Sequence, residues 1–467
     1  MIALLLFGFA AAQVALVLFQ PIALVYLSLL TGGVPLTFGQ GEINESDFGR
    51  MDLSATRMFG LLIASALLAC FHFTQAWTYI RRWKYHVLFL LFCCATLAWA
   101  PSLIYGTRMI AKLASPLLFM VLIMLAVTNL RQLRTMENMI LIAAVVMLSL
   151  ACAIKVLGLQ RGETVGLTVP GIGPATFSAY ILAAGMLALA GLRDSNRVLK
   201  MGLVGLFAIV VILGNTRITI GAMFVGFSIL LIVGLKGFSR YLLPLGGIVA
   251  LPALFILNQR FRERMFYGEE GGSVDAVINN PLAAIQHIHG SGRFDAWDIV
   301  LNKFFLPNPL IGSGTGATQH YFYSQIGGGI GVIHSEYVRL LSEVGLIGLG
   351  LFLMTVLAYL IQLINTFRSS SNAETKKYAL AGIGGIIAYV IFMATDNAFD
   401  YVNQFGIYVF SMVAMGEKSR ELELAAQSEV LVAAPVEDGE APIVSVGSSM
   451  RPGRRRYSLL EEGQHAK

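Results

Sequence analysis

The sequence predicts an all-α, polytopic membrane protein, a helix bundle of about 12 transmembrane helices with one long outward-facing loop and a disordered tail. Composition is the first observation behind this prediction: of 467 residues, 56% are apolar and 13% are charged, and the mean hydropathy is +0.72. Soluble chains have about 45 to 50% apolar and about 25% charged residues. A large soluble domain is therefore excluded.

The second observation is a series of apolar runs bounded by charged or turn residues. They fall at about 2–30, 58–79, 85–104, 109–130, 138–157, 174–192, 200–214, 218–235, 241–257, 338–364, 379–396 and 403–415. The first run contains Pro21, so it is either one kinked span or a span followed by a re-entrant piece. The last run is short for a full crossing.

The third observation is that the basic residues gather in alternate short connections, at 81–84, 131–134, 193–200, 236–240 and 368–377. The positive-inside rule makes these connections and both termini cytoplasmic. The chain then divides into helices 1–9 (1–257), an outward loop that carries the catalytic candidates (258–337), helices 10–12 (338–415) and a disordered cytoplasmic tail (416–467). The net charge of +6 reflects these loops and does not indicate nucleic-acid binding.

The junction of the outward loop with the next span carries the strongest candidate, His334, which opens the stretch HSEYVRLLSEVGLIGL. At helical spacing His334 and Tyr337 share a face, and Arg339 and Glu343 are four residues apart and can pair. A neutral imidazole at a helix mouth can take a proton from a sugar hydroxyl. The alternative is an interfacial histidine that only caps the span.

Two arginines expected on the outer side are candidate phosphate ligands. Arg217 stands between two apolar runs and has no acidic neighbour in sequence, and Arg293 lies in the stretch HGSGRFDAW. Two planar guanidinium groups suit a diphosphate, because each can grip phosphate oxygens through two hydrogen bonds. The alternatives are a snorkelling interfacial arginine for Arg217, and a pair with Asp295 or packing on Trp297 for Arg293.

Three further patterns are weaker. The stretch NPLIGSGTG, with Gly312 and Gly314, offers a turn that can cradle an anion, although a plain loop is the simpler interpretation. His287 and His289 have the spacing of a metal clip, but no further ligands accompany them, so we expect no metal. The four cysteines lie in apolar runs, which indicates small core residues without disulfides.

The combination of an outward arginine, GRxxxW, NPxxGxG and HSEYxxxLxExGxxG resembles the O-antigen ligase and O-antigen polymerase family. This resemblance covers about residues 290–350 and Arg217, and elsewhere rests on the number of spans. It implies a glycosyltransferase of the bacterial inner membrane that acts on the periplasmic side, inverting and metal-independent, without cofactors. By position, Arg217 and Arg293 would hold the diphosphate and His334 would activate the acceptor, with Glu336, Tyr337, Glu343, Gly312 and Gly314 in support.

The resemblance implies an undecaprenyl diphosphate-linked glycan as donor and a glycan or lipid-linked glycan as acceptor. It leaves open a polymerase of surface polysaccharide or exopolysaccharide, which the run Tyr321, Phe322 and Tyr323 favours as a stacking surface, and a ligase onto lipid A-core. A flippase and a chain-length regulator are expected partners of a polymerase. A transporter or flippase for a lipid-linked glycan is the alternative of another class, but transporters place ionisable residues at the bilayer midplane.

Overall fold

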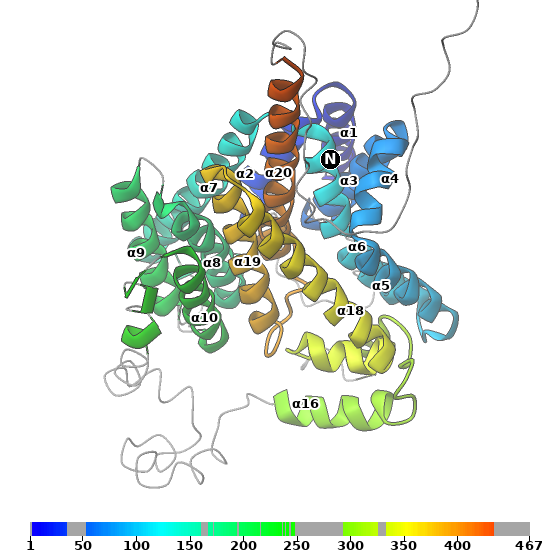
Figure 1. Ribbon diagram of the computed structural model, residues 1–467. Helices are drawn as coiled ribbons and strands as arrows, with labels where there is room; N and C mark the ends of the chain where they lie inside the picture. Colours follow the sequence, from blue (N-terminus) through cyan, green and yellow to red (C-terminus); the bar gives the residue numbers. More distant parts are fainter. Residues whose placement is uncertain are drawn as a thin grey trace, which may run out of the picture. The chain divides into compact units, whose positions relative to one another are not determined.

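The structure is a computed structural model that describes residues 2–34, 53–159, 167–170, 172–193, 196–214, 216–235, 237–238, 240–241, 244–247, 293–325 and 333–433. All regular structure in these ranges is helical, which confirms the all-α prediction (Figure 1). The chain forms two compact units, 1–424 and 425–467, and the following description concerns the first.

The helices of the N-terminal half are α1 (Ile2–Phe19), α2 (Pro21–Thr31), α3 (Leu53–Phe71), α4 (Phe73–Arg82), α5 (Lys84–Ala95), η2 (Thr96–Trp99), α6 (Leu103–Ala126), α7 (Leu130–Val156), α8 (Pro174–Ala190), η3 (Gly191–Arg193), α9 (Arg197–Leu213) and α10 (Arg217–Gly234). Those that follow are α16 (Arg293–Val300), the π-helix η4 (Leu301–Phe305), α17 (Ala317–Gln325), α18 (Glu336–Ser369), α19 (Ala373–Phe392), the π-helix η5 (Val402–Gly406) and α20 (Ile407–Ala433).

Among the described residues, five helices are long and apolar enough to cross a membrane: α6, α7, α10, α18 and α19. A sixth span is reached if α3 and α4, which are bent by 112°, count as one. Shorter apolar helices such as α2, α5 and α8 do not meet the length, and most of the run 241–257 lies outside the described residues. The polytopic character is thus supported, and the total of about 12 spans stays a prediction.

The first apolar run consists of two helices that are separated at Gln20, where Pro21 begins α2. Proline suits the first helical position because it lacks the N–H that a helix interior requires. Beyond α2, the buried Arg57 donates to the carbonyl oxygens of Thr31 and Gly32. Arg57 therefore caps the end of α2, where a cation is favourable.

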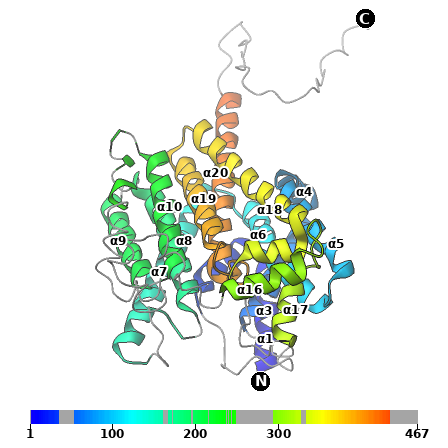
Figure 2. The same ribbon diagram turned by 90° about the horizontal axis from the view of Figure 1, so that it is seen from below.

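Helices α8 and α19 form the centre of the bundle, and α10 and α18 pack against α19 (Figures 1 and 2). Small residues allow this close approach: nearly every residue of α8 is buried, and a Cβ on Gly384 of α19 would fall on the side chain of Leu230 in α10. Membrane helices associate through such small residues because lipid provides no hydrophobic driving force between them.

One end of the bundle gathers the bases that the loop charges predict to share a membrane side. Arg134, near the start of α7, pairs with Glu374 at the start of α19. Glu137 accepts hydrogen bonds from Lys200 of α9 and from Lys377 of α19, the latter at 2.7 Å, and all three side chains are buried. These contacts place the beginnings of α7, α9 and α19 at the same end of the bundle.

Helix α18 is broken near its start by a loop that packs into the break. Gly345 has φ 64° and ψ −168°, and the N–H groups of Leu346 and Ile347 donate to the carbonyl oxygens of Pro309 (2.9 Å) and Leu310 (3.1 Å). A Cβ on Gly345 would fall on the backbone of Leu310. The break therefore depends on glycine, since other residues rarely adopt a positive φ and none fits this contact.

We expect Gly345→Ala to destabilise the protein by at least about 1 to 2 kcal/mol, the cost of a left-handed conformation with a side chain, and by more where the backbone must move. Gly350→Ala in the same helix is the matched control, because nothing lies within 4 Å of its Cβ position. Thermal unfolding of both purified variants in detergent checks this prediction. Equal midpoints would show that the loop yields without cost.

The sequence predicted a disordered tail from residue 416, and this start is wrong, because α20 is helical to Ala433. The segment contains many helix-forming residues, and Lys418–Glu421 (2.8 Å) and Arg420–Glu423 (3.0 Å) are ion pairs three residues apart. Glu423 also accepts hydrogen bonds from Ser370 and Ser371, between α18 and α19, which lower its pKa to about 2 against the effect of burial. Residues 434–467 lie outside the described residues.

Candidate active site

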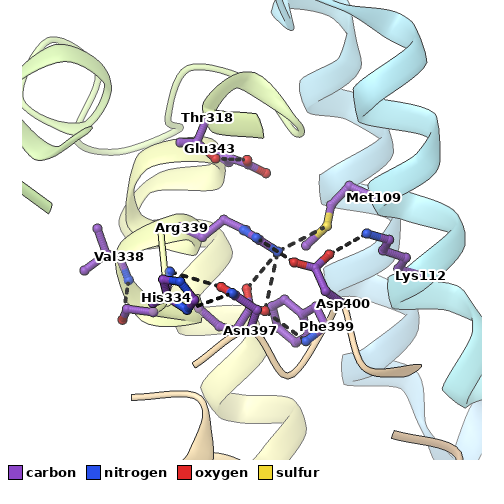
Figure 3. Close-up of polar contacts among 12 residues, drawn as sticks. Met109, Lys112, Thr318, His334, Val338, Arg339, Glu343, Asn397, Phe399 and Asp400 are labelled. Atoms are coloured by element: carbon purple, nitrogen blue, oxygen red, sulfur yellow. Dashed lines mark hydrogen bonds and ion pairs between the residues drawn. The ribbon is translucent and has the colours of Figure 1, made fainter. Parts of the chain in front are cut away.

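His334 lies directly before α18 in a backbone conformation that is unusual for its residue type. Its φ is 52°, and no other residue except glycine has a positive φ in the described ranges. Its N–H donates to Oδ1 of Asn397 at 3.1 Å, and Ser335, the next residue, caps α18 by accepting from the N–H of Val338 at 3.4 Å (Figure 3). Such a conformation costs about 1 to 3 kcal/mol, and residues that adopt it concentrate at functional sites.

The imidazole of His334 is 38% exposed and is oriented by two residues that follow α19. Nδ1 lies 3.2 Å from Nδ2 of Asn397 and 3.8 Å from Oδ1 of Asp396. Because Oδ1 of Asn397 accepts from the main chain of His334, its NH₂ group must face the ring, so Nδ1 accepts and a neutral ring carries its hydrogen on Nε2. A tautomer with Nδ1–H would instead turn toward Asp396.

A network of four ionisable side chains lies beside His334, of which Arg339 and Glu336 are buried and Asp400 and Lys112 are partly buried (Figure 3). Arg339 pairs with Glu336 at 3.1 Å and with Asp400 at 3.0 Å, and Asp400 also pairs with Lys112 of α6. Burial alone would raise the pKa of Asp400, but Arg339 and Lys112 outweigh it, so that this pKa lies below its usual range. The segment after α19 is thus fixed against both α6 and α18.

The predicted pair of Arg339 with Glu343 is not among the ion pairs that the structure shows for Arg339. Glu343 instead accepts from the N–H of Gly316 at 2.8 Å and from the hydroxyl of Thr318. Tyr337, which was predicted to share a face with His334, donates its hydroxyl to the carbonyl of Val390 at 2.8 Å. Both side chains therefore hold neighbouring segments around the start of α18.

The glycine-rich loop is a packing element. Gly312, Gly314 and Gly316 all have positive φ values, between 69° and 97°. The N–H groups of Ser313 and Gly314 donate to carbonyl oxygens of α18 at 2.9 Å, and that of Gly316 donates to Glu343. These amides are not free to cradle an anion, so the glycines support the site by allowing the loop to close the break in α18.

Arg293 contacts the segment that orients His334. It begins α16, and its Nη1 donates to the carbonyl of Thr395 at 2.8 Å, directly before Asp396. Its Nε is buried and has no hydrogen-bond partner in the described part of the chain. Neither Asp295 nor Trp297 holds this guanidinium: Trp297 donates to the carbonyl of Ile333 at 2.7 Å and thereby fixes the backbone before His334.

Arg217 is the first residue of α10 and is half-buried. Helices α10 and α19 run antiparallel. Gly234, at the end of α10, lies against Leu380, whereas Gly226, earlier in α10, lies against Gly384, which comes later in α19. The start of α10 therefore lies at the end of the bundle where α19 ends and the segment with Asp396 begins. The contacts of His334 described above do not include Arg217.

Several weaker predictions fall elsewhere. His287 and His289 lie outside the described residues, and within those residues no three His, Cys, Asp or Glu side chains converge as metal ligands would. His320 packs its ring against Tyr105, with 5.6 Å between centroids. Of the cysteines, which were predicted to be core residues, only Cys93 is buried. An exposed cysteine in an apolar span faces lipid, which the sequence alone cannot separate from the core.

Asn397, Asp400 and Arg339 are central to the site but were not predicted for it from the sequence. Asp396 and Asp400 lie about 60 residues after His334 in the chain, and no spacing pattern connects them to it. The one available signal was the group of polar residues in TDNAFDY, directly after an apolar run. Polar groups at the end of a span are normally solvated, so that only the tertiary structure distinguishes a site from a loop.

We expect Asp400→Asn to destabilise the protein by about 2 to 3 kcal/mol at pH 7, somewhat less than for a fully buried pair, because Glu336 still faces Arg339. A carboxylate whose pKa is lowered on folding stabilises the folded state at pH values above its pKa in the unfolded chain, near 3.9. This stabilisation is lost as the pH falls through the lower pKa of the folded state. The difference in thermal midpoint between wild type and variant should therefore shrink only below about pH 4. Asp295→Asn, at an exposed position, is the control.

Comparison with known proteins gives a family match for part of the chain. Residues 202–353, about a third of the chain, match the family model of O-antigen ligase, while a search of curated proteins found no match. The matched segment contains His334, Arg217 and Arg293, whereas Asp396, Asn397, Asp400 and Lys112 lie outside it. Over this segment the helical chain is similar to O-antigen ligase, and this match supports the resemblance to the O-antigen ligase and polymerase family.

Proposed function

We propose that the protein transfers a glycan from undecaprenyl diphosphate to a sugar hydroxyl at the periplasmic face of a bacterial inner membrane. The observation that carries this proposal is the position of His334, which the family match includes and which Asn397 holds in a strained backbone conformation at a half-exposed site. The neighbouring Arg293 retains a buried donor that has no partner in the described part of the chain. A base beside a cationic anchor suits this reaction.

The proposed reaction is an in-line displacement at C1 of the donor sugar. The acceptor hydroxyl oxygen attacks C1 and its proton passes to Nε2 of His334, while the bond between C1 and the diphosphate breaks and its electron pair remains on the diphosphate oxygen. Arg293 and Arg217 neutralise the charge that grows there. Attack opposite to the leaving group inverts C1, and diphosphate leaves readily enough that the reaction needs neither metal nor nucleotide.

The hydrogen bonds of His334 set a requirement for this step. Nε2 can accept a proton only when the ring hydrogen is on Nδ1, and Asn397 offers its NH₂ group there. A small rotation toward Asp396, whose Oδ1 is 3.8 Å from Nδ1, would give Nδ1–H a carboxylate partner. Asp396 is 3% exposed and already accepts from Tyr401 at 3.0 Å, so that it would orient the ring without entering the reaction.

The experiment that tests this function uses the purified full-length chain in detergent with a lipid-diphosphate-linked oligosaccharide. Release of undecaprenyl diphosphate that depends on His334 indicates transfer. The proposed transfer would be contradicted if the lipid-linked oligosaccharide stayed intact in the presence of added acceptor sugars or of a second lipid-linked chain. Movement of the intact lipid across a vesicle membrane would then identify the alternative, a transporter or flippase.

The acceptor distinguishes a polymerase from a ligase in the same assay. Growth of longer glycans from the lipid-linked donor alone identifies a polymerase, whereas a requirement for lipid A-core identifies a ligase. The aromatic stretch that favoured a polymerase is only partly available for stacking on a glycan, because Phe322 is 1% exposed and Tyr323 stacks on Tyr105. The polymerase remains our proposal, with a flippase and a chain-length regulator as partners.

The proposed site requires residues 258–337 to face the periplasm and both termini to lie in the cytoplasm. An alkaline phosphatase reporter fused after Asn280 should be active, because phosphatase folds only outside the cytoplasm, and one fused after Lys236 should be inactive. Equal expression of both fusions is the control. The reverse pattern would place His334 on the cytoplasmic side and would exclude the proposed reaction there.

A further inference from the structure

Helix α4 is a short helix that turns away from the direction of the bundle. The sequence predicted one span over 58–79, but α3 ends at Phe71 and α4 leaves it at an angle of 112°, after a break at His72. If α3 crosses the membrane, a helix that leaves it at nearly a right angle lies along the membrane plane. The ten residues of α4 extend about 15 Å at 1.5 Å per residue, which is too short for a crossing.

The contacts of α4 place it where α20 becomes polar. Ala76 and Tyr79 form its buried face, and the hydroxyl of Tyr79 donates to Glu421 of α20 at 2.8 Å. Arg82 pairs with the same carboxylate at 3.5 Å. Helix α20 is apolar through Met415 and continues as GEKSRELE, so α4 packs against the part of α20 that has left the apolar segment. This level corresponds to the boundary between hydrocarbon and water.

A different face of α4 carries exposed aromatic residues. Phe73 and Trp77, one turn apart, are 63% and 43% exposed and stack with 6.1 Å between ring centroids. The guanidinium of Arg81, a further turn along, lies 5.1 Å from the Trp77 ring. Phe71, at the end of α3, is 68% exposed. This row has no partner in the described part of the chain, and aromatic residues beside exposed bases are typical of membrane interfaces.

We propose that α4 is an in-plane membrane anchor that binds the phosphate groups of anionic lipids on the membrane side where α20 becomes polar. Phe73 and Trp77 enter the boundary between headgroups and acyl chains, while Arg81 and Lys84, both exposed, contact lipid phosphates. Arg82 is occupied by Glu421 and contributes to packing. The occupant is a lipid because the row combines apolar insertion with positive charge, which an anionic leaflet complements.

Trp77 provides a probe for this proposal. The full-length protein is reconstituted in vesicles of phosphatidylcholine and phosphatidylglycerol in which either one or the other lipid carries brominated acyl chains, at equal bromine content. The signal of Trp77 is the difference between wild type and Trp77→Phe. We expect both lipids to quench it, and brominated phosphatidylglycerol to quench it at least about twofold more strongly, since each base near an anionic surface favours binding by about fivefold.

Arg81→Gln combined with Lys84→Gln should remove the preference for phosphatidylglycerol and leave quenching by phosphatidylcholine. The ratio of the two quenching values cancels any change in the brightness of Trp77 caused by losing Arg81. Arg131→Gln combined with Arg197→Gln removes the same charge from exposed positions elsewhere and should leave the preference unchanged. Absent quenching of Trp77, as behind a protein partner, or equal quenching by both lipids in the wild type, would overturn the proposal.

Discussion

Replacing His334 by alanine is expected to lower glycan transfer by about 100-fold or more, within the range of about 10² to 10⁴ that general bases contribute. Binding of the lipid-linked donor should remain, because the variant keeps Arg217 and Arg293, the proposed ligands of the diphosphate. The measurement is the release of undecaprenyl diphosphate under saturating donor, beside a binding assay. His320→Ala is the matched control, since His320 lies in the same predicted outward loop but packs on Tyr105.

The fold around His334 should persist in mildly acidic medium, because Arg339 and Lys112 keep the pKa of Asp400 low and its carboxylate ionised. Thermal unfolding at the pH of each transfer assay checks this, since an unchanged midpoint shows that a change in rate is not caused by unfolding. Comparable transfer by His334→Ala would contradict the mechanism, as would inactivation by EDTA that zinc reverses.

Replacing Arg293 by alanine should cost about 2 to 4 kcal/mol of transition-state stabilisation, about 30- to 1000-fold in rate. Arg293→Lys should restore little, because lysine cannot donate both to the carbonyl of Thr395 and, through a planar fork, to phosphate. Arg217→Ala should have an effect in the same range if its side chain reaches the diphosphate. Steady-state rates with donor titration measure both effects.

Arg197→Ala is the control for these variants, because Arg197 is exposed at the start of α9, at the end of the bundle opposite to Arg217. Protein levels and thermal midpoints separate a loss of catalysis from a loss of folding, which matters for Arg293 because it also fixes the segment before Asp396. Near-normal transfer by Arg217→Ala at normal protein levels would remove Arg217 from the site and leave Arg293 as the proposed anchor.

The sequence singled out candidate polar side chains but assigned some of them the wrong partners. Arg339 and Glu343 were expected to pair along one helix, as their spacing allows, yet Arg339 binds Asp400 and Glu343 binds the loop at Gly316 and Thr318. Helical spacing predicts only local contacts, each worth about 0.2 to 0.5 kcal/mol. Partners from distant segments override these weak preferences when both groups are buried, because a buried charge must be paired.

By itself, the sequence determined that this chain is an all-α protein with apolar, membrane-spanning character, and it singled out His334 and the O-antigen ligase motif as the candidate site. Composition and the length of apolar runs are sufficient for the first, because a bilayer admits few other structures. Only the tertiary structure decided that Asn397 fixes the backbone of His334, that Arg293 reaches the segment before Asp396, and that α4 turns out of the predicted span. These features depend on contacts between segments far apart in the chain, which no local pattern specifies.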